Sequence, residues 1–252
     1  MKPSPHRFFP LLLAALLAQP AFAGGELEVR WWAPDLSSTV TADGAGFDPD
    51  VILPNSLDLG LDAEEDFEGR LTLRASFGLF VRGAYQNISS DGSTRLDIGV
   101  VGLPFDVTAD IGTGIDFEYA RLSIGWMFGA QGPITFALFG EAKAVRGDAS
   151  ISASAFGLSA GLSEDFEAAV PAAGAMLRLR AGANLEVFAE VSVAVDTDEA
   201  DVLDYEAGVR LFLGQSLGVG AGYRVLEIDG TFDSVEVDYQ LEGPFANALL
   251  RW

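Results

Sequence analysis

The sequence contains no cysteine, and its only histidine is His6. Without cysteine, no disulfide framework or thiolate metal site can form, so the fold depends on packing and backbone pairing. Residues after position 6 hold no histidine, which excludes from them any histidine-based hydrolase mechanism and any histidine-ligated metal site. Proteases, phospholipases and deacylases that use a histidine base are thereby excluded from this part of the chain.

Lysine is almost as rare, since only Lys2 and Lys143 occur. A serine nucleophile with a lysine base would need Lys143. This lysine shares a strand face with Glu141, and that pattern favours an ion pair over catalysis. The acidic runs Asp62–Glu68 and Asp196–Asp201 lack the glycine-punctuated spacing of a calcium loop. We therefore predict a non-enzymatic protein with no catalytic residue, no bound cofactor and no dedicated metal site.

No apolar run is long enough for a transmembrane helix, which needs about 20 residues. The longest uncharged apolar stretch after the first 23 residues is Ala168–Leu177. The start of the chain has a different pattern, with Lys2 and Arg7 before an apolar run and Ala21-Phe22-Ala23 after it. This pattern predicts a cleaved secretory signal peptide at residues 1–23, followed by one domain at residues 24–252.

The charge balance is strongly acidic, with 15 basic and 37 acidic residues and a net charge of −22. Removal of the predicted signal peptide, which carries two of the basic residues, would make the balance more negative still. Nucleic acid is therefore not an expected partner, because the Coulomb interaction is repulsive. The mean hydropathy is nevertheless positive at +0.27. Both properties are compatible if apolar residues occupy every second position and face lipid.

Alternation of apolar and polar residues recurs along the chain and is typical of strands with one apolar face. It is clearest at Leu185–Val195. We predict ten strands, which include Leu27–Ala33, Arg70–Arg74, Leu79–Tyr85, Ile115–Phe128, a strand from Ile134 to Lys143, Ala169–Arg180, Leu185–Val195, Leu203–Leu211, Leu217–Val225 and Val235–Trp252. Short turns alternate with long or acidic connections at Asp35–Glu68, Ile88–Gly114, Asp148–Asp165 and Asp196–Asp201. Within these connections, Leu57–Asp62 is open to interpretation as a short extra strand, and so is strand character around Leu96–Val101.

The last predicted strand carries a family resemblance. Val235, Val237, Tyr239 and Leu241 form one apolar row, and after Gly243-Pro244 the apolar parity shifts by one residue, which predicts a bulge. A second row follows at Ala246, Ala248, Leu250 and Trp252. A chain that ends in this way resembles the closing strand of Gram-negative outer-membrane β-barrels.

The resemblance implies an all-β, transmembrane, antiparallel up-and-down barrel of about ten strands, with eight or twelve as alternatives. It also implies export to the cell outer membrane, contact with outer-membrane lipid, and recognition by the barrel assembly machinery during insertion. The oligomeric state is left open. An even number of strands in meander order, with short turns at one end and long loops at the other, agrees with this architecture.

Strand parity then predicts which side chains face the lumen. Charges of both signs inside a narrow barrel must pair, because an isolated buried charge is heavily penalised. The predicted lumen charge network consists of Arg70, Arg82, Glu141, Lys143, Arg178, Glu186, Glu190, Asp204, Glu206, Arg210, Arg224 and Arg251. Two aromatic girdles are predicted at the membrane interfaces, with Tyr85, Tyr205, Tyr223 and Tyr239 at the outer one and Trp126, Phe128 and Trp252 at the inner one.

Three functions fit this pattern. The first is a non-enzymatic barrel with a structural or surface-interaction role, whose acidic surface loops attract Mg²⁺ or Ca²⁺ weakly and diffusely. The second is a narrow, cation-preferring, porin-like channel. The third is a soluble periplasmic barrel that binds an apolar ligand, which would need the apolar faces to point inward.

Overall fold

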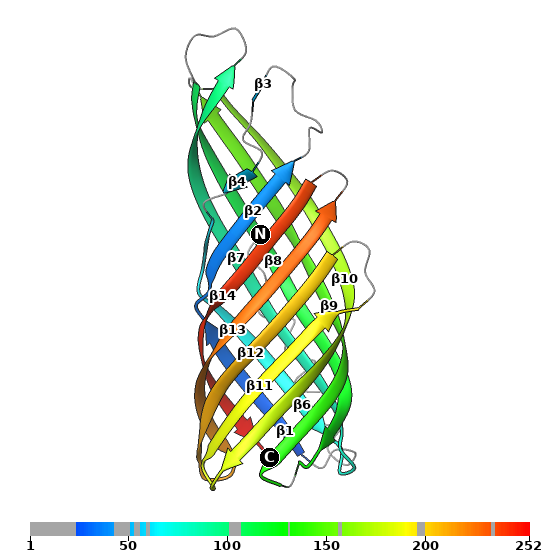
Figure 1. The fold of residues 1–252 in the computed structure, drawn as a ribbon. Coiled ribbons are helices and arrows are strands. Elements are labelled where there is room, and N and C mark those ends of the chain that lie inside the picture. The colour runs from blue at the N-terminus through cyan, green and yellow to red at the C-terminus, as the bar shows by residue number, and fades with distance from the viewer. Residues whose placement is uncertain are drawn as a thin grey trace, which may run out of the picture.

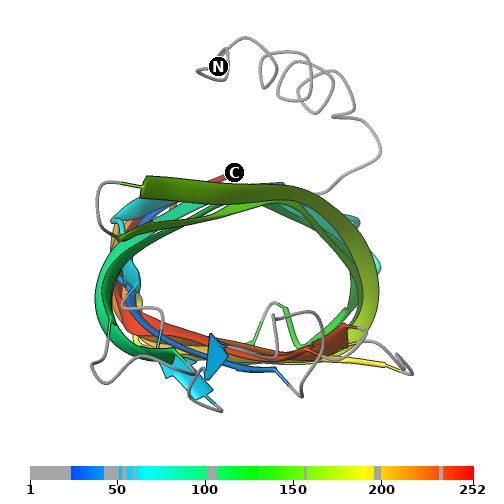
Figure 2. The same cartoon turned by 90° about the horizontal axis from the view of Figure 1, so that it is seen from above.

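The chain forms one closed antiparallel sheet (Figures 1 and 2) in a computed structural model that describes residues 24–42, 51–52, 56–58, 61–100, 107–130, 132–155, 158–195, 200–232 and 235–252. The predicted signal peptide lies outside these residues. Among the described residues, no helix is long and apolar enough to cross a membrane.

Ten strands make the barrel wall, so the predicted up-and-down barrel is confirmed and the counts of eight and twelve are wrong. One strand is interrupted at residues 33–34 and consists of β1 (Gly24–Trp32) and β2 (Asp35–Ala42). The others are β6 (Asp66–Arg74), β7 (Leu79–Val100), β8 (Val107–Phe128), β9 (Ile134–Ala155), β10 (Leu158–Ala181), β11 (Leu185–Ala194), β12 (Ala200–Leu213), β13 (Leu217–Phe232) and β14 (Val235–Arg251). Short strands β3 (Val51–Ile52), β4 (Ser56–Asp58) and β5 (Leu61–Ala63) pair with β7 and β2, so the extra strand character near residue 57 is confirmed.

The seam of the barrel lies between the first and last strands. Residue 252 clamps it with two backbone hydrogen bonds, because Gly25 N–H donates to the Trp252 carbonyl at 3.0 Å and Trp252 N–H donates to the Gly25 carbonyl at 3.1 Å. A side chain at Gly25 would collide with the Trp252 indole. Closure leaves no unpaired edge in the apolar part of the wall, as a lipid-embedded sheet requires.

The turns at one end are short and follow a common rule. Gly78, Gly129, Gly182 and Gly214 have positive φ angles in the connections after β6, β8, β10 and β12. A positive φ is readily adopted only by glycine, so these residues make the tight turns possible. Short turns lie on the periplasmic side of barrels of this architecture, which orients the protein.

The outer wall carries an apolar belt above these turns. Along β9 the outward positions run from Ile134 through Leu138 to Ala144 before the exposed Arg146. At about 3.3 Å per residue and a tilt of about 40°, this stretch covers about 25 Å, which matches the lipid-facing band of an outer-membrane barrel. Polar residues end the belt on or beside seven of the nine other wall strands, at Asp35, Glu65, Asn87, Glu118, Glu167, Glu227 and Glu242; with Arg146 we call them the polar collar.

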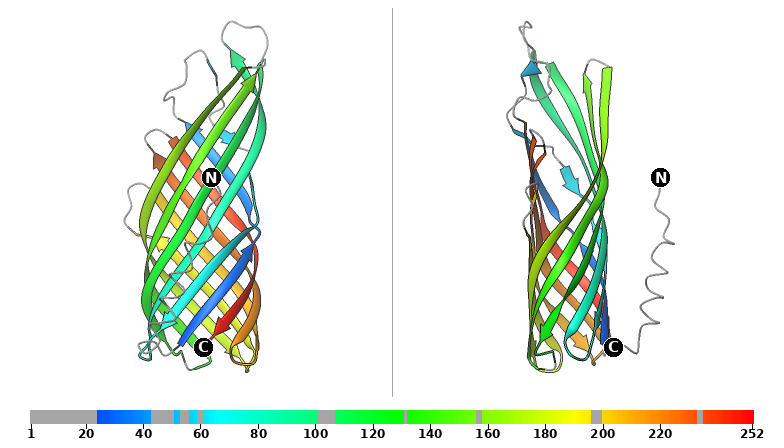
Figure 3. Two further views of the ribbon diagram at one scale, coloured as in Figure 1. Left: turned by 180° about the vertical axis from the view of Figure 1, so that it is seen from behind. Right: turned by 90° about the vertical axis from the view of Figure 1, so that its right-hand side faces the viewer.

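Beyond the collar, β7 to β10 continue as a tall extension above the shorter β11 (Figure 3). The long loops predicted at Ile88–Gly114 and Asp148–Asp165 are therefore wrong, because most of these residues lie in strands. The predicted loop at Asp35–Glu68 is also partly wrong, since it contains β2 and the start of β6. Serine, aspartate and glycine suggested loops by composition, whereas continuous pairing with neighbouring strands keeps these segments extended.

The polarity of the wall inverts beyond the polar collar, which corrects two predictions about β14. Its pairing register with β13 stays constant from Phe232↔Val235 to Leu217↔Leu250, so there is no bulge at Gly243-Pro244. Tyr239 and Leu241 lie inside the barrel, buried to 7% and 0% exposure. Tyr239 is therefore not an interface aromatic. Water rather than lipid surrounds this level, so these two apolar side chains face inward.

The other girdle residues lie on the outer wall. Trp126, Phe128, Tyr205, Tyr223 and Trp252 are between 41% and 51% exposed, and Tyr85 is half-buried. Because the large exposed apolar side chains point away from the lumen, the hypothesis of a soluble barrel with an inward apolar face is wrong.

The belt generates a test of the membrane register. Leu138 is 51% exposed near the middle of the belt, whereas Ser150 is exposed on the same strand and face beyond the collar. Leu138→Arg should lower the free energy of unfolding by about 2–4 kcal/mol, because it places a charge in hydrocarbon. Ser150→Arg should change it by less than about 0.5 kcal/mol. Urea titrations of both variants folded into lipid vesicles measure this, and equal losses would refute the register.

Candidate functional site

The twelve residues of the predicted lumen network lie inside the barrel. Eleven are at most 8% exposed, and Arg251 has a side chain that is 13% exposed. Five further charged residues that the sequence analysis did not include are buried with them, namely Glu26, Glu28, Arg30, Glu68 and Arg121. Glu68 had been assigned to a loop, although its alternation with Arg70 and Thr72 on β6 was a usable signal.

Glu206 of β12 is the first centre of the network. Arg70 of β6 donates to both of its carboxylate oxygens, at 3.0 and 3.2 Å. Arg30 of β1 also donates to both, with one contact at 3.0 Å. Two arginines from the opposite part of the wall therefore share one carboxylate across the lumen. Such charge-assisted bidentate bonds are the strongest hydrogen bonds that side chains make.

Asp204 and Glu68 form the second centre. Arg224 donates to both oxygens of Asp204 at 3.0 and 2.9 Å, and Arg121 donates to one of them at 3.0 Å. The same two arginines donate to Glu68, at 2.9 and 2.7 Å. Four strands, β6, β8, β12 and β13, are thus joined through the lumen, and of these only β12 and β13 also pair through their backbone edges.

A smaller group lies beside these centres. Arg82 of β7 makes two bonds of 2.6 Å to Glu190 of β11, on the opposite wall. Glu141 accepts a hydrogen bond from Ser123 at 2.6 Å and lies 3.9 Å from the Lys143 amine. Lys143 is thus placed beside Glu141, as an ion pair at the outer limit of contact.

Aromatic rings separate the layers of charge. Arg30 lies 4.0 Å from the centroid of Phe245, and Arg210 lies 4.0 Å from that of Phe188. Arg224 lies 4.7 Å from the Trp32 ring. A guanidinium over an aromatic face gains cation–π attraction while its edge stays available for carboxylates. Parity places these rings on the inner face, as with Phe188 between Glu186 and Glu190, but it does not show which guanidinium each ring contacts, because these partners are distant in sequence.

An apolar cluster covers the network on the extracellular side. Its buried members include Trp32, Ile88, Phe117, Leu226, Tyr239 and Leu241. Tyr239 crosses toward Phe117, with ring centroids 6.1 Å apart. Burial raises the pKa of Tyr239 to about 12, so its hydroxyl stays protonated at neutral pH. The described part of the lumen is therefore filled by two kinds of layer, one ion-paired and one apolar.

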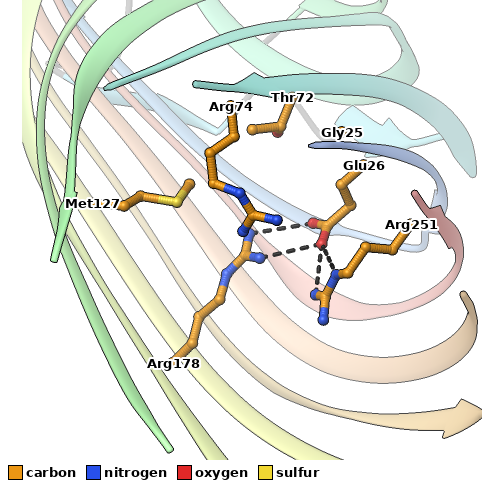
Figure 4. A pocket seen from close by; sticks show the side chains of 7 residues that line it. All are labelled: Gly25, Glu26, Thr72, Arg74, Met127, Arg178 and Arg251. Carbon is orange, nitrogen blue, oxygen red and sulfur yellow. Dashed lines mark hydrogen bonds and ion pairs between the residues drawn. The ribbon is translucent and has the colours of Figure 1, made fainter. Parts of the chain in front are cut away.

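The periplasmic mouth holds a small pocket of about 10 Å³ (Figure 4). It is lined by Gly25, Glu26, Thr72, Arg74, Met127, Arg178 and Arg251. Glu26 accepts two bonds of 3.2 Å from Arg178 and bonds of 3.0 and 2.6 Å from Arg251. Among the described residues, no group of three or more metal-ligating side chains could hold a metal ion.

The network generates a double-mutant test at Arg82 and Glu190. Arg82→Met should cost about 3–5 kcal/mol of unfolding free energy, because it leaves a buried carboxylate unpaired. Adding Glu190→Met should recover most of this loss, since two apolar side chains of similar size can replace a buried pair. Urea unfolding of both variants measures the coupling. Additive losses in the double variant would mean that the two side chains do not form the pair seen in the structure.

Comparison with known proteins agrees with the fold. No protein-family model matches the chain, and no curated protein matches its sequence. Among solved structures, the outer membrane protease OmpT of Escherichia coli superposes with a TM-score of 0.62 at 8% identity, over 91% of this chain and 97% of OmpT. The translocator domain of the autotransporter NalP of Neisseria meningitidis gives 0.48 at 10% identity, over 97% and 94% of the two chains.

The attachment invasion locus protein Ail of Yersinia pestis gives a TM-score of 0.33 at 16% identity, over 91% of this chain and 98% of Ail. At such identities the likeness concerns the fold alone, and OmpT carries that argument. The superposition on OmpT agrees with the closed meander, the short glycine turns and the apolar belt. These observations together show that this chain has the fold of a ten-stranded Gram-negative outer-membrane β-barrel.

Proposed function

We propose that the protein is a non-enzymatic, non-conducting outer-membrane barrel that presents its strand extension at the cell surface. The observation that carries this proposal is the ion-paired filling of the lumen. Bonds of 2.6–3.2 Å join opposite walls at Arg82–Glu190 and Arg70–Glu206, where a pore would need open water. Barrels need about sixteen strands before an aqueous channel remains open, whereas about eight can be filled by side chains.

A cation-preferring channel receives less support from this geometry. An ion that crossed the lumen would have to separate buried guanidinium–carboxylate pairs, which costs several kcal/mol for each charge left unpaired. The apolar cluster around Tyr239 and Leu241 adds a second, dry barrier above them.

A hydrolytic function also receives little support, although OmpT is a protease by name. The sequence has no histidine after His6, and within the described residues the one lysine, Lys143, lies in the charge network. The likeness to OmpT therefore transfers the barrel and not its chemistry.

The extension of β7 to β10 offers the surface for interaction. Where its side chains are described, the exposed ones are short and polar, and they include Asp91, Asp116, Asp148 and Ser150. Ser150 and Ser152 donate to the backbone carbonyls of Gly114 and Gly112, both at 3.3 Å. A paired wall of this kind holds acidic groups at fixed positions above the membrane.

The first experiment tests conduction. Purified protein, shown to be folded by its heat-modifiable gel migration, is reconstituted into planar lipid bilayers beside an open porin as the sensitivity control. The proposal predicts no unitary current, because the ion pairs and the apolar cluster occupy the lumen. Cation-selective steps from the folded protein would refute it and favour the channel.

The second experiment tests the surface charge. Six carboxylates of the polar collar and the acids of the extension should attract Mg²⁺ or Ca²⁺ weakly, through many loosely placed oxygens. Calorimetric titration should show weak binding that disappears as monovalent salt rises, because screening limits diffuse attraction. Tight binding of a single Ca²⁺ that persists in high salt would contradict this expectation.

A further inference from the structure

The lumen charges do not balance at every level. In the central layers, Arg30, Arg70, Arg121 and Arg224 face four carboxylates, and Arg82 and Lys143 face two. At the periplasmic mouth the described side-chain carboxylates are Glu26 and Glu186, and Glu28 of the next layer also contacts Arg210 at 2.7 Å, whereas the cations are Arg74, Arg178, Arg180, Arg210 and Arg251. The excess of three cations is confined to this end of a chain that is otherwise strongly acidic.

Arg74 is the cation of this group that has no ion-pair partner among the described residues. It is half-buried at the end of β6, and no described carboxylate lies within ion-pair distance of it, whereas Arg180, 32% exposed, contacts Glu186 at 3.4 Å. Figure 4 shows the guanidinium groups of Arg74 and Arg178 beside each other, with the Glu26 carboxylate bonded to Arg178 and Arg251. Two guanidinium groups placed side by side repel each other unless an anion lies between them.

The pocket between these groups has the size of a single ion. Its volume of about 10 Å³ is room for roughly one water-sized particle. Arg74, Arg178 and Arg251 supply donors on its walls, and the Thr72 hydroxyl and the Gly25 backbone complete the lining.

We propose that the periplasmic mouth is a binding site for one monatomic anion, of the chemical class of chloride or bromide, held by Arg74, Arg178 and Arg251. The anion supplies the negative charge that Glu26 alone does not provide. The site is distinct from the surface extension and lies at the opposite end of the barrel. An anion from solution pairs with these arginines there, as carboxylates of the chain pair with arginines elsewhere in the lumen.

The test uses the folded full barrel in a non-ionic detergent and the linewidth of the ³⁵Cl⁻ NMR signal. A site that exchanges chloride broadens this signal beyond the contribution of detergent alone. The excess broadening should disappear in Arg74→Gln, because the unpaired guanidinium is removed, and should persist in the matched control Arg180→Gln, whose side chain does not line the pocket. Addition of bromide should compete the broadening away, whereas sulfate at equal ionic strength should not.

A second measurement keeps the test independent of that variant. Crystals soaked in bromide should show an anomalous peak between the guanidinium groups of Arg74, Arg178 and Arg251, and Thr72→Val should weaken the peak without changing the fold. Broadening that is equal in wild type and Arg74→Gln would overturn the proposal. The same holds for bromide-soaked crystals with no peak in the pocket.

Discussion

The desolvation of charge inside a closed, lipid-embedded wall is the constraint on which this structure depends. A carboxylate or guanidinium in the lumen has little access to water, so each must find a partner of opposite sign or be heavily penalised. Glu206, Asp204 and Glu68 satisfy this need by each accepting bonds from two or more arginines. The network therefore joins side chains of strands that are not neighbours in the sheet, such as β6 with β12, as well as side chains of paired strands, such as β12 with β13.

Such cross-lumen bonds give the barrel a rigidity that backbone ladders do not supply. The ladders fix the wall, but a ring of ten strands can flatten or widen without losing its backbone bonds. Pairs such as Arg178–Glu26 and Arg82–Glu190 join walls that face each other. These bonds fix the distance between opposite walls of the barrel. A wall held in this way is a stable base for strands that project beyond the membrane.

Sequence reasoning found the architecture and the polarity of the belt, because both follow from a period of two residues. It failed where the surroundings of the wall change from lipid to water. Where water surrounds the wall, the apolar residues of an alternating strand face inward instead of outward. Tyr239 was therefore assigned to the outer face although it is buried. Composition was misleading for Ile88–Gly114, since serine and glycine are frequent in loops and also in solvated strands.

The residues of the network were predictable by strand parity, but their partners were not. Arg30 and Glu206 are 176 positions apart and meet only because the barrel closes. Arg121 and Glu68 were missed although local alternation was a usable signal for both, with Ser123 on β8 and with Arg70 on β6. The aromatic faces over Arg30 and Arg210 likewise depend on the opposite wall.

The central claim is that buried guanidinium groups are fixed across the lumen. Arginine-selective NMR of the barrel in lipid nanodiscs tests it directly, because a bidentate guanidinium exchanges its protons slowly and its N–C bonds rotate slowly. We predict separate, slowly exchanging guanidinium signals from Arg30, Arg70, Arg121 and Arg224, each lost when that arginine is replaced. Averaged signals in fast exchange with water, for all four, would contradict the account.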